Sequence, residues 1–475
     1  MRINRIRFPE ELLRSVWFWV FALIIIFAGS YYPFRPDYFN YYEPTIIWLN
    51  KYGLITGVAN IDWNLGQMSV FHIMQAGLDQ ILDPFQRLGI FITILFLVYL
   101  FERKAYLLLF VIPLGFLFIQ APSPDEAIFY FSLVIVNELC FNYKTGNFKV
   151  LFLVSVFTFI IKPVAFWLPL WTFFAYFSLN IKELKDYRSY LFPSLLVIIF
   201  LVKNVIASST LFYPITFTKI HTYWLTDSRI LDLSNQKAAL YTFANFFTIG
   251  EINSMTFFQK FYYWISISEL QTIINFIILI SIITSGVFIF WKKNFLYRSL
   301  WIIIVIKSLI VFNFSGQFRF ILDGIFPLLL ILLYPFLTAK IKIFITALAF
   351  SLFFLLLISY PPLLKWSIPE FKLTRWMANG FTKESLFIPR RYQIGSYAEE
   401  NIGNLDFYIS SHSYNYDTPP PAFSSKILKQ CYDLGIFPQM KDTATVRKGY
   451  YMKMLTPEER EDLDRIIKKY FHSSR

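Results

Sequence analysis

Long apolar runs recur along most of the chain, and the short loops between them carry many of its lysines and arginines. A transmembrane helix needs roughly 20 mainly apolar residues, and fewer where neighbouring protein shields it. The sequence therefore predicts an all-α polytopic membrane protein with about eleven transmembrane helices. The runs that qualify, or nearly qualify, cover about residues 15–32, 88–101, 105–120, 126–142, 148–161, 163–179, 189–205, 271–291, 298–314, 318–336 and 342–360.

Composition and charge exclude the soluble classes. Of the 475 residues, 56% are hydrophobic and only 16% are charged, whereas a soluble domain carries about 25% charged residues. The net charge of +13 is divided among small basic clusters between the apolar runs, which is typical of short cytoplasmic loops and not of a nucleic-acid-binding patch. We therefore expect the lipid bilayer, and no nucleic acid, as a partner.

Placing the basic clusters in the cytoplasm predicts the topology. The N-terminus is then cytoplasmic and the C-terminal tail extracytoplasmic. We expect a transmembrane domain over residues 1–360, with long outer loops over 32–87 and 206–270. Residues 361–475 are expected to form a small folded extracytoplasmic domain that closes with a helix from Pro457.

Some helix boundaries also follow from the sequence. Pro163 lacks a backbone donor and disfavours helical geometry in the residue before it, so the apolar stretch 150–179 is expected to divide there into two helices. In the first outer loop, segments 39–52 and 70–85 carry apolar residues at helical spacing and are expected to be amphipathic helices.

Ionisable residues inside apolar runs stand out, because each costs about 2.5–3.5 kcal/mol at the centre of a bilayer. Lys307 and Asp323 fit a structural ion pair. Lys162, beside a proline, and Arg319, at the start of another helix, lie at outer turns. Both fit either a phosphate-binding role, for which arginine is suited by its bidentate fork, or a simple topology signal.

Acidic residues on the outer side form a second set. Asp37 follows the first apolar run, where a carboxylate can act as general base toward a hydroxyl. Asp125 and Glu126 follow a Pro-Ser-Pro turn, and the alternative interpretation is a helix start capped by Ser123. Asp62 is a further candidate.

Aromatic residues near these acids include Tyr41 and Trp63. Such rings either anchor the chain at the membrane interface or stack on a sugar. The sequence carries no nucleotide-binding motif, no nucleophile elbow and no metal-ligand spacing of cysteine or histidine.

The chain resembles the GT-C superfamily of integral-membrane glycosyltransferases, in which one acid follows the first span and a second acid occupies the next outer turn. Asp37 and Asp125 stand at those two positions. Several short stretches also resemble a bacterial family of GT-C-like multi-pass membrane proteins: the segment from Asp37 to Gly66, Pro122 to Asp125, Ile161-Lys162, Arg319-Phe320 and Cys431-Tyr432-Asp433.

This resemblance implies a GT-C-like bundle in the bacterial inner membrane that transfers a sugar from a polyprenyl-phosphate-linked donor to a glycan or glycolipid acceptor. Asp37 is implied as general base, and Lys162 with Arg319 as the donor-phosphate site. Asp125 and Glu126 are implied to orient the donor or a metal ion. We expect no required cofactor and no dedicated metal site, with Mg²⁺ or Mn²⁺ as the alternative.

Other functions share parts of this pattern. A lipid-linked glycan polymerase or ligase has the same architecture but joins oligosaccharides. A non-catalytic transporter or a scaffold of cell-envelope assembly is the alternative from another class. The secondary site candidates are Asp62, Lys307, Tyr41 and Trp63.

Overall fold

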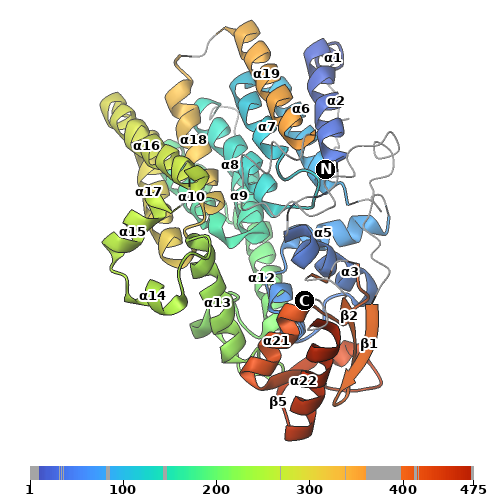
Figure 1. The fold of residues 1–475 in the computed structure, drawn as a ribbon. Coiled ribbons are helices and arrows are strands. Elements are labelled where there is room, and N and C mark those ends of the chain that lie inside the picture. The colour runs from blue at the N-terminus through green and yellow to red at the C-terminus, as the bar shows by residue number, and fades with distance from the viewer. Residues whose placement is uncertain are drawn as a thin grey trace. The chain divides into compact units, whose positions relative to one another are not determined.

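The computed structural model, drawn in Figure 1, divides into two compact units, each built from three separate segments of the chain. The first unit comprises Met1–Phe34, Phe85–Ser194 and Ala239–Arg390, and the second comprises Arg35–Pro84, Leu195–Ala238 and Arg391–Arg475. The described residues are 10–31, 33, 35, 37–81, 86–142, 147–267, 269–336, 339–359, 397–410, 414–415 and 417–471.

The first unit is helical in the residues that are described. Helices α12 (Arg188–Ser208) and α13 (Ser228–Thr242) each carry residues of both units. The remaining helices of the first unit are α1 (Glu10–Leu13), α2 (Val16–Gly29), α6 (Leu88–Glu102), α7 (Ile112–Gly115), α8 (Pro124–Phe141), α9 (Phe148–Ile161), α10 (Trp167–Leu179), α11 (Ile181–Leu184), α14 (Ile249–Ser254), α15 (Phe257–Ser266), α16 (Glu269–Lys292), α17 (Phe295–Ser315), α18 (Leu322–Leu333) and α19 (Lys340–Ser359).

Four helices of the described chain are long and apolar enough to cross a membrane: α12, α16 from Gln271, α17 and α19. Six further apolar segments form shorter helices, at Val16–Gly29, Leu88–Glu102, Tyr106–Gly115, Phe148–Ile161, Pro163–Leu179 and Leu322–Leu333. These positions agree with the apolar runs of the sequence and are compatible with a helical membrane protein. The number of spans, expected as about eleven, stays a prediction.

Prolines set two of the element boundaries. Helix α9 ends at Ile161, and Lys162 has extended backbone angles (φ −152°, ψ 119°) before a 3₁₀ helix over Pro163–Phe166. The predicted division at this proline is therefore confirmed. By contrast, the apolar run 105–120 forms a 3₁₀ helix over Tyr106–Val111 and then the single turn α7, because Pro113 has no donor with which to continue a regular α-helix.

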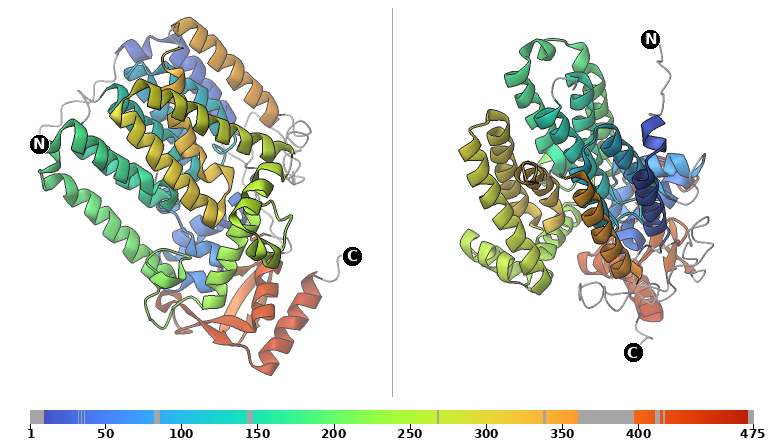
Figure 2. Two further views of the ribbon diagram at one scale, coloured as in Figure 1. Left: turned by 90° about the vertical axis from the view of Figure 1, so that its left-hand side faces the viewer. Right: turned by 90° about the horizontal axis from the view of Figure 1, so that it is seen from above.

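Helices α16, α17 and α18 pack closely within the first unit, and Figure 2 shows α16 and α17 side by side. Their contacts bury Ile278, Val311 and Ile325, together with Phe243 and Trp264 of the segment that precedes α16. This apolar core fixes the start of α18, and the candidate residue Arg319 lies in the turn just before that start.

The second unit combines short helices with two small sheets. Strands β1 (Tyr397–Ile402) and β2 (Leu405–Ser410) form an antiparallel hairpin, and β3 (Ala422–Phe423) pairs parallel with β2. Strands β4 (Ile436–Met440) and β5 (Tyr450–Met454) form the second, antiparallel sheet. The helices are α3 (Glu43–Tyr52), α4 (Trp63–Gly66), α5 (Val70–Asp79), α21 (Ser425–Leu434) and α22 (Pro457–Phe471). Helices α3 and α5 lie within the predicted segments 39–52 and 70–85, although α3 starts only at Glu43 and α5 ends at Asp79, and the closing helix starts at Pro457 as predicted.

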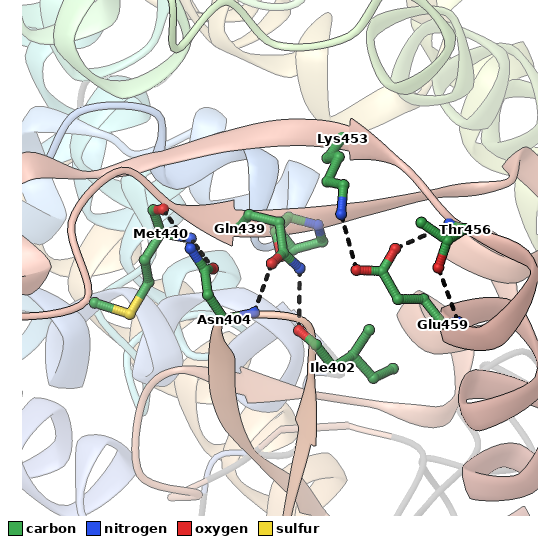
Figure 3. A network of polar contacts seen from close by, with 8 residues as sticks. Ile402, Asn404, Gln439, Met440, Lys453, Thr456 and Glu459 are labelled. Atoms are coloured by element: carbon green, nitrogen blue, oxygen red, sulfur yellow. Dashed lines mark hydrogen bonds and ion pairs between the residues drawn. The ribbon is translucent and has the colours of Figure 1, made fainter.

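Polar side chains fasten the strands to one another (Figure 3). The Gln439 side chain donates to the Ile402 carbonyl (3.0 Å) and accepts from the Asn404 backbone N–H (2.7 Å). At the start of α22, the Glu459 carboxylate accepts from the Thr456 N–H (2.9 Å) and pairs with Lys453 (3.0 Å). These contacts fix the turn between β1 and β2 and the start of α22.

One apolar core joins the first loop to the C-terminal segment. It buries Trp48, Val58 and Ile61 together with Phe407 and Leu428. The compact units therefore group residues 35–84 with the C-terminal segment, whereas the sequence placed the loop 32–87 in the domain 1–360. Residues 360–396, where the expected C-terminal domain begins, lie outside the described residues.

Candidate functional site

Three of the candidate residues meet in the first unit. The Lys162 ammonium forms an ion pair with Oδ1 of Asp125, and Nη1 of Arg319 lies 3.7 Å from Oδ2 of the same carboxylate. The Asp125 side chain is only 2% exposed, whereas those of Lys162 and Arg319 are 21% and 19% exposed. A buried carboxylate thus holds two cations that remain partly accessible; we call these three residues the cation cluster.

Asp125 owes its position to the start of α8. Pro124 begins the helix, which needs no donor from its first residue, and Asp125 and Glu126 follow in the first turn. Ser123 stands at the N-cap, but within the described part of the chain its hydroxyl makes no capping hydrogen bond. The expected acidic first turn is therefore present, while the expected serine cap is not.

Lys162 lies at the junction of α9 and the following 3₁₀ helix. Its backbone N–H donates to the Thr158 carbonyl (3.3 Å), and its own carbonyl accepts from Ala165 N–H (3.0 Å). Because both backbone groups are bonded, the extended geometry of Lys162 is held firmly. The sequence pattern Lys-Pro thus sets the point from which the side chain reaches Asp125.

Arg319 lies in a 3₁₀ turn over Phe318–Phe320. Two hydrogen bonds hold the backbone of Gly316, just before this turn. The Gly316 N–H donates to Thr242 Oγ1 (2.8 Å), and its carbonyl accepts from Trp264 Nε1 (2.6 Å). A Cβ at this glycine would lie 2.9 Å from the Thr242 methyl group. The guanidinium itself donates from Nε to the Gln317 side chain (3.1 Å).

A second layer of side chains supports the two cations. The Phe320 ring lies 4.2 Å from the Lys162 ammonium and 5.0 Å from the Arg319 guanidinium carbon. Lys307 donates to the backbone carbonyl of Phe320 and pairs with Asp323. Trp167 Nε1 donates to the other Asp323 oxygen (2.8 Å). Lys307 and Asp323 therefore form the structural ion pair that the sequence suggested, and both side chains are fully buried.

Glu126 does not join the cation cluster. One of its carboxylate oxygens accepts hydrogen bonds from Thr93 and from the Tyr130 hydroxyl (3.2 Å), and no described residue bonds the other oxygen. Consecutive residues of a helix do not share a face. Glu126 and Asp125 thus project into different surroundings, although the sequence grouped them in one role.

The remaining candidates belong to the second unit. Asp37 is half-buried and immediately precedes a π-helical turn over Tyr38–Tyr42. Tyr41 packs edge-on against His72, with ring centroids 5.1 Å apart, while Trp63 is buried in the apolar core. Whether Asp37 faces the cation cluster stays a prediction.

Asp62 acts as the N-cap of α4. Its Oδ1 accepts from the backbone N–H of Asn64 (2.9 Å) and from the Asn64 side chain (2.8 Å). Burial raises the pKa of this carboxyl from 3.8 to about 6, against the lowering effects of the Asn64 bonds and of Lys426. This geometry gives Asp62 a structural role in the first loop.

Sequence reasoning missed the partners of several candidates. Trp167, Thr93 and Tyr130 are ordinary core residues by type, and no local pattern marks them as hydrogen-bond donors to a buried acid. Phe320 carries a weak signal, since it directly follows Arg319. These contacts depend on the packing of helices that are far apart in the sequence.

The cation cluster is poorly suited to a divalent metal ion. Both oxygens of Asp125 face a lysine or an arginine, and a metal ion beside them would be repelled by the two cations. Among the described residues, no group of three or more histidine, cysteine, aspartate or glutamate side chains comes together. The site therefore favours an anionic ligand over a metal.

Comparison with known proteins identifies one family. A family model described as a domain of unknown function (DUF8201) matches residues 4–326, more than half of the chain. The match includes Asp37 and all three residues of the cation cluster. No curated protein and no solved structure gives a significant match.

Proposed function

Because the chain belongs to the DUF8201 family, whose description assigns no function, we propose a function from the site: a membrane glycosyltransferase. It moves a sugar from a polyprenyl-phosphate-linked donor to a glycan or glycolipid acceptor. The observation that carries the proposal is the convergence of Lys162 and Arg319 on the buried carboxylate of Asp125.

The charge balance of the cation cluster favours a phosphate. Two cations and one carboxylate leave a net charge of +1, and the cations are the partly exposed members. The guanidinium fork matches phosphate oxygens bidentately, while the lysine ammonium supplies a compact second charge. Asp125 acts here as a positioning residue, because it holds both cations in place before the ligand arrives.

In the proposed reaction, an acceptor hydroxyl attacks the anomeric carbon of the donor sugar. A new bond forms between that carbon and the acceptor oxygen, and the bond to the phosphate oxygen breaks. Lys162 and Arg319 stabilise the charge that develops on the departing polyprenyl phosphate. Asp37 accepts the proton of the acceptor hydroxyl, a step worth a factor of about 10²–10⁴ in rate.

The proposed location follows from the apolar helices and the basic loops. Four helices of membrane-spanning length support an integral membrane protein. The clusters of lysine and arginine between apolar runs favour a cytoplasmic N-terminus and an extracytoplasmic C-terminal domain in the inner membrane. The sugar transfer is proposed for the extracytoplasmic side.

A test compares the surface glycans and lipid-linked sugars of cells that lack the gene with those of cells complemented by variants. Wild type and Arg298→Ala are expected to restore one glycosylated product. Arg298 is a matched control, since it is a cation of the first unit whose guanidinium donates to the Phe290 carbonyl, away from the cation cluster. Asp37→Asn and Arg319→Ala are expected to leave the product absent and the donor accumulated.

The same experiment separates the other functions. A polymerase or ligase would leave the single repeat unit intact and shorten or detach the longer glycan. For a transporter or scaffold, Asp37→Asn would restore the product to the wild-type amount. That last result would contradict the proposed role of Asp37 as general base.

A further inference from the structure

A groove of about 500 Å³ opens in the second unit among helices α3, α5 and α12. Its walls are mainly apolar and include Leu49, Ile73, Ala76 and Val202. None of these residues belongs to the cation cluster. The groove is therefore a separate feature that the proposed function does not use.

One wall of the groove is a face of a membrane-length helix. Helix α12 carries Leu195, Ile198, Ile199 and Val202 at the spacing i, i+3, i+4, i+7, and each side chain is half-exposed or more. Three of these four residues line the groove. On a helix of membrane-spanning length we expect such an exposed apolar stripe to face hydrocarbon, which would make the groove continuous with the lipid-facing surface.

The polar groups around the groove are largely bonded to protein. The Asn50 side chain donates to Asp79 (3.0 Å), and the Gln80 side chain donates to the Asn50 carbonyl (3.5 Å). Lys203 is buried at the groove and donates to the Met68 carbonyl (2.6 Å). The Lys203 amino group is thus held by the protein, and apolar side chains make up most of the groove's lining.

We propose that this groove binds one acyl chain of a phospholipid from the surrounding bilayer. The apolar walls take the chain, which enters from the exposed apolar face of α12. This binding site does not depend on the proposed sugar transfer.

Gly77 offers a way to fill the groove without disturbing the fold. It lies in α5, lines the groove and has no heavy atom within 4 Å of an added Cβ. Gly77→Leu therefore places a side chain in the space proposed for the lipid. Gly250 of α14 is a matched control, because a Cβ there also meets nothing within 4 Å.

The test reconstitutes the full chain in nanodiscs of phosphatidylcholine and phosphatidylglycerol, the latter carrying a photoreactive group on its acyl chain. After irradiation, lipid adducts are mapped by mass spectrometry. We expect adducts on residues 73–79 of α5 in the wild type and in Gly250→Leu, and a loss of at least fivefold in Gly77→Leu. Gly77→Ala is expected to give an intermediate loss.

Two results would overturn the inference. One is labelling of α12 with no adduct on α5, which would show that lipid covers the helix but does not enter the groove. The other is equal α5 labelling in Gly77→Leu and the wild type. Neither of these outcomes bears on the glycan profile, so the two proposals fail separately.

Discussion

At the scale of single residues, charge in the sequence predicted candidate residues but not the contacts that they make. Lys162 and Arg319 could be identified from the sequence because an ionisable group in an apolar run is costly and therefore conspicuous. That Asp125 is their common partner could not be derived in the same way, since Asp125 and Lys162 are 37 residues apart in the sequence. Glu126 shows the limit most clearly: it neighbours Asp125 in sequence but bonds Thr93 and Tyr130 instead.

The substitution Asp62→Asn tests the burial of a carboxyl in the first loop. The folded state raises the pKa of Asp62 from 3.8 to about 6, so folding favours the protonated carboxyl. The stability that this preference contributes is complete below about pH 4 and is lost as the pH rises through about 6. Asparagine keeps a capping oxygen but does not ionise. The variant is therefore expected to gain about 3 kcal/mol in unfolding free energy at pH 7.5 and little at pH 4.

Thermal unfolding in nanodiscs at the two pH values measures this difference. A variant that is less stable than the wild type at pH 7.5, but not at pH 4, would contradict the expectation. It would mean that attraction to Lys426 outweighs the cost of burying the charge.

At the scale of elements, buried polar contacts decide how helices are held. Lys307 of α17 and Asp323 of α18 form an ion pair that also bonds α10 through Trp167. The sequence suggested this pair because both residues interrupt apolar runs. It gave no sign that the pair supports Phe320, whose ring contacts both cations of the proposed phosphate site.

Breaking this pair leaves one buried charge without its partner, which costs about 3–5 kcal/mol. Lys307→Met and Asp323→Leu are each expected to lower the unfolding free energy by about this amount. The double variant is expected to lose less than the sum, because it leaves neither charge buried. Unfolding measurements on all four proteins give the coupling directly, and strictly additive losses would show that the two side chains do not depend on each other.

Glycine positions test how the first loop joins the C-terminal segment. Gly449 has φ +82°, and a Cβ there would overlap the Thr56 carbonyl, which accepts a hydrogen bond from Tyr450 N–H (3.0 Å). Gly435 has a similar φ of +64° but meets no atom within 4 Å. Both alanine variants bear the backbone strain of about 1–2 kcal/mol, and only Gly449→Ala also separates the two segments.

We therefore expect Gly449→Ala to expose the C-terminal segment to limited proteolysis well before Gly435→Ala does. Equal cleavage rates in the two variants would show that this close approach does not hold the segments together.

At the scale of the whole molecule, the sequence predicted where helices occur better than how they are grouped. The apolar runs predict the positions of most helices to within a few residues, and Pro163 correctly predicts the boundary after α9. The joint core of Trp48 and Phe407 was not predicted, because a hydrophobic pattern shows which face is buried but not what covers it. The same reason explains why residues 35–84 were assigned with the transmembrane segments.

The central claim is that Lys162 and Arg319 bind the phosphate of a polyprenyl carrier. Native mass spectrometry of the full chain in nanodiscs, titrated with a polyprenyl phosphate, tests it most directly. The wild type and Arg298→Ala are expected to bind equally, and Lys162→Ala and Arg319→Ala at least tenfold more weakly, as loss of a charge-assisted hydrogen bond of about 1.5–3 kcal/mol requires. Equal affinity in all four proteins, or no binding by the wild type, would contradict the claim.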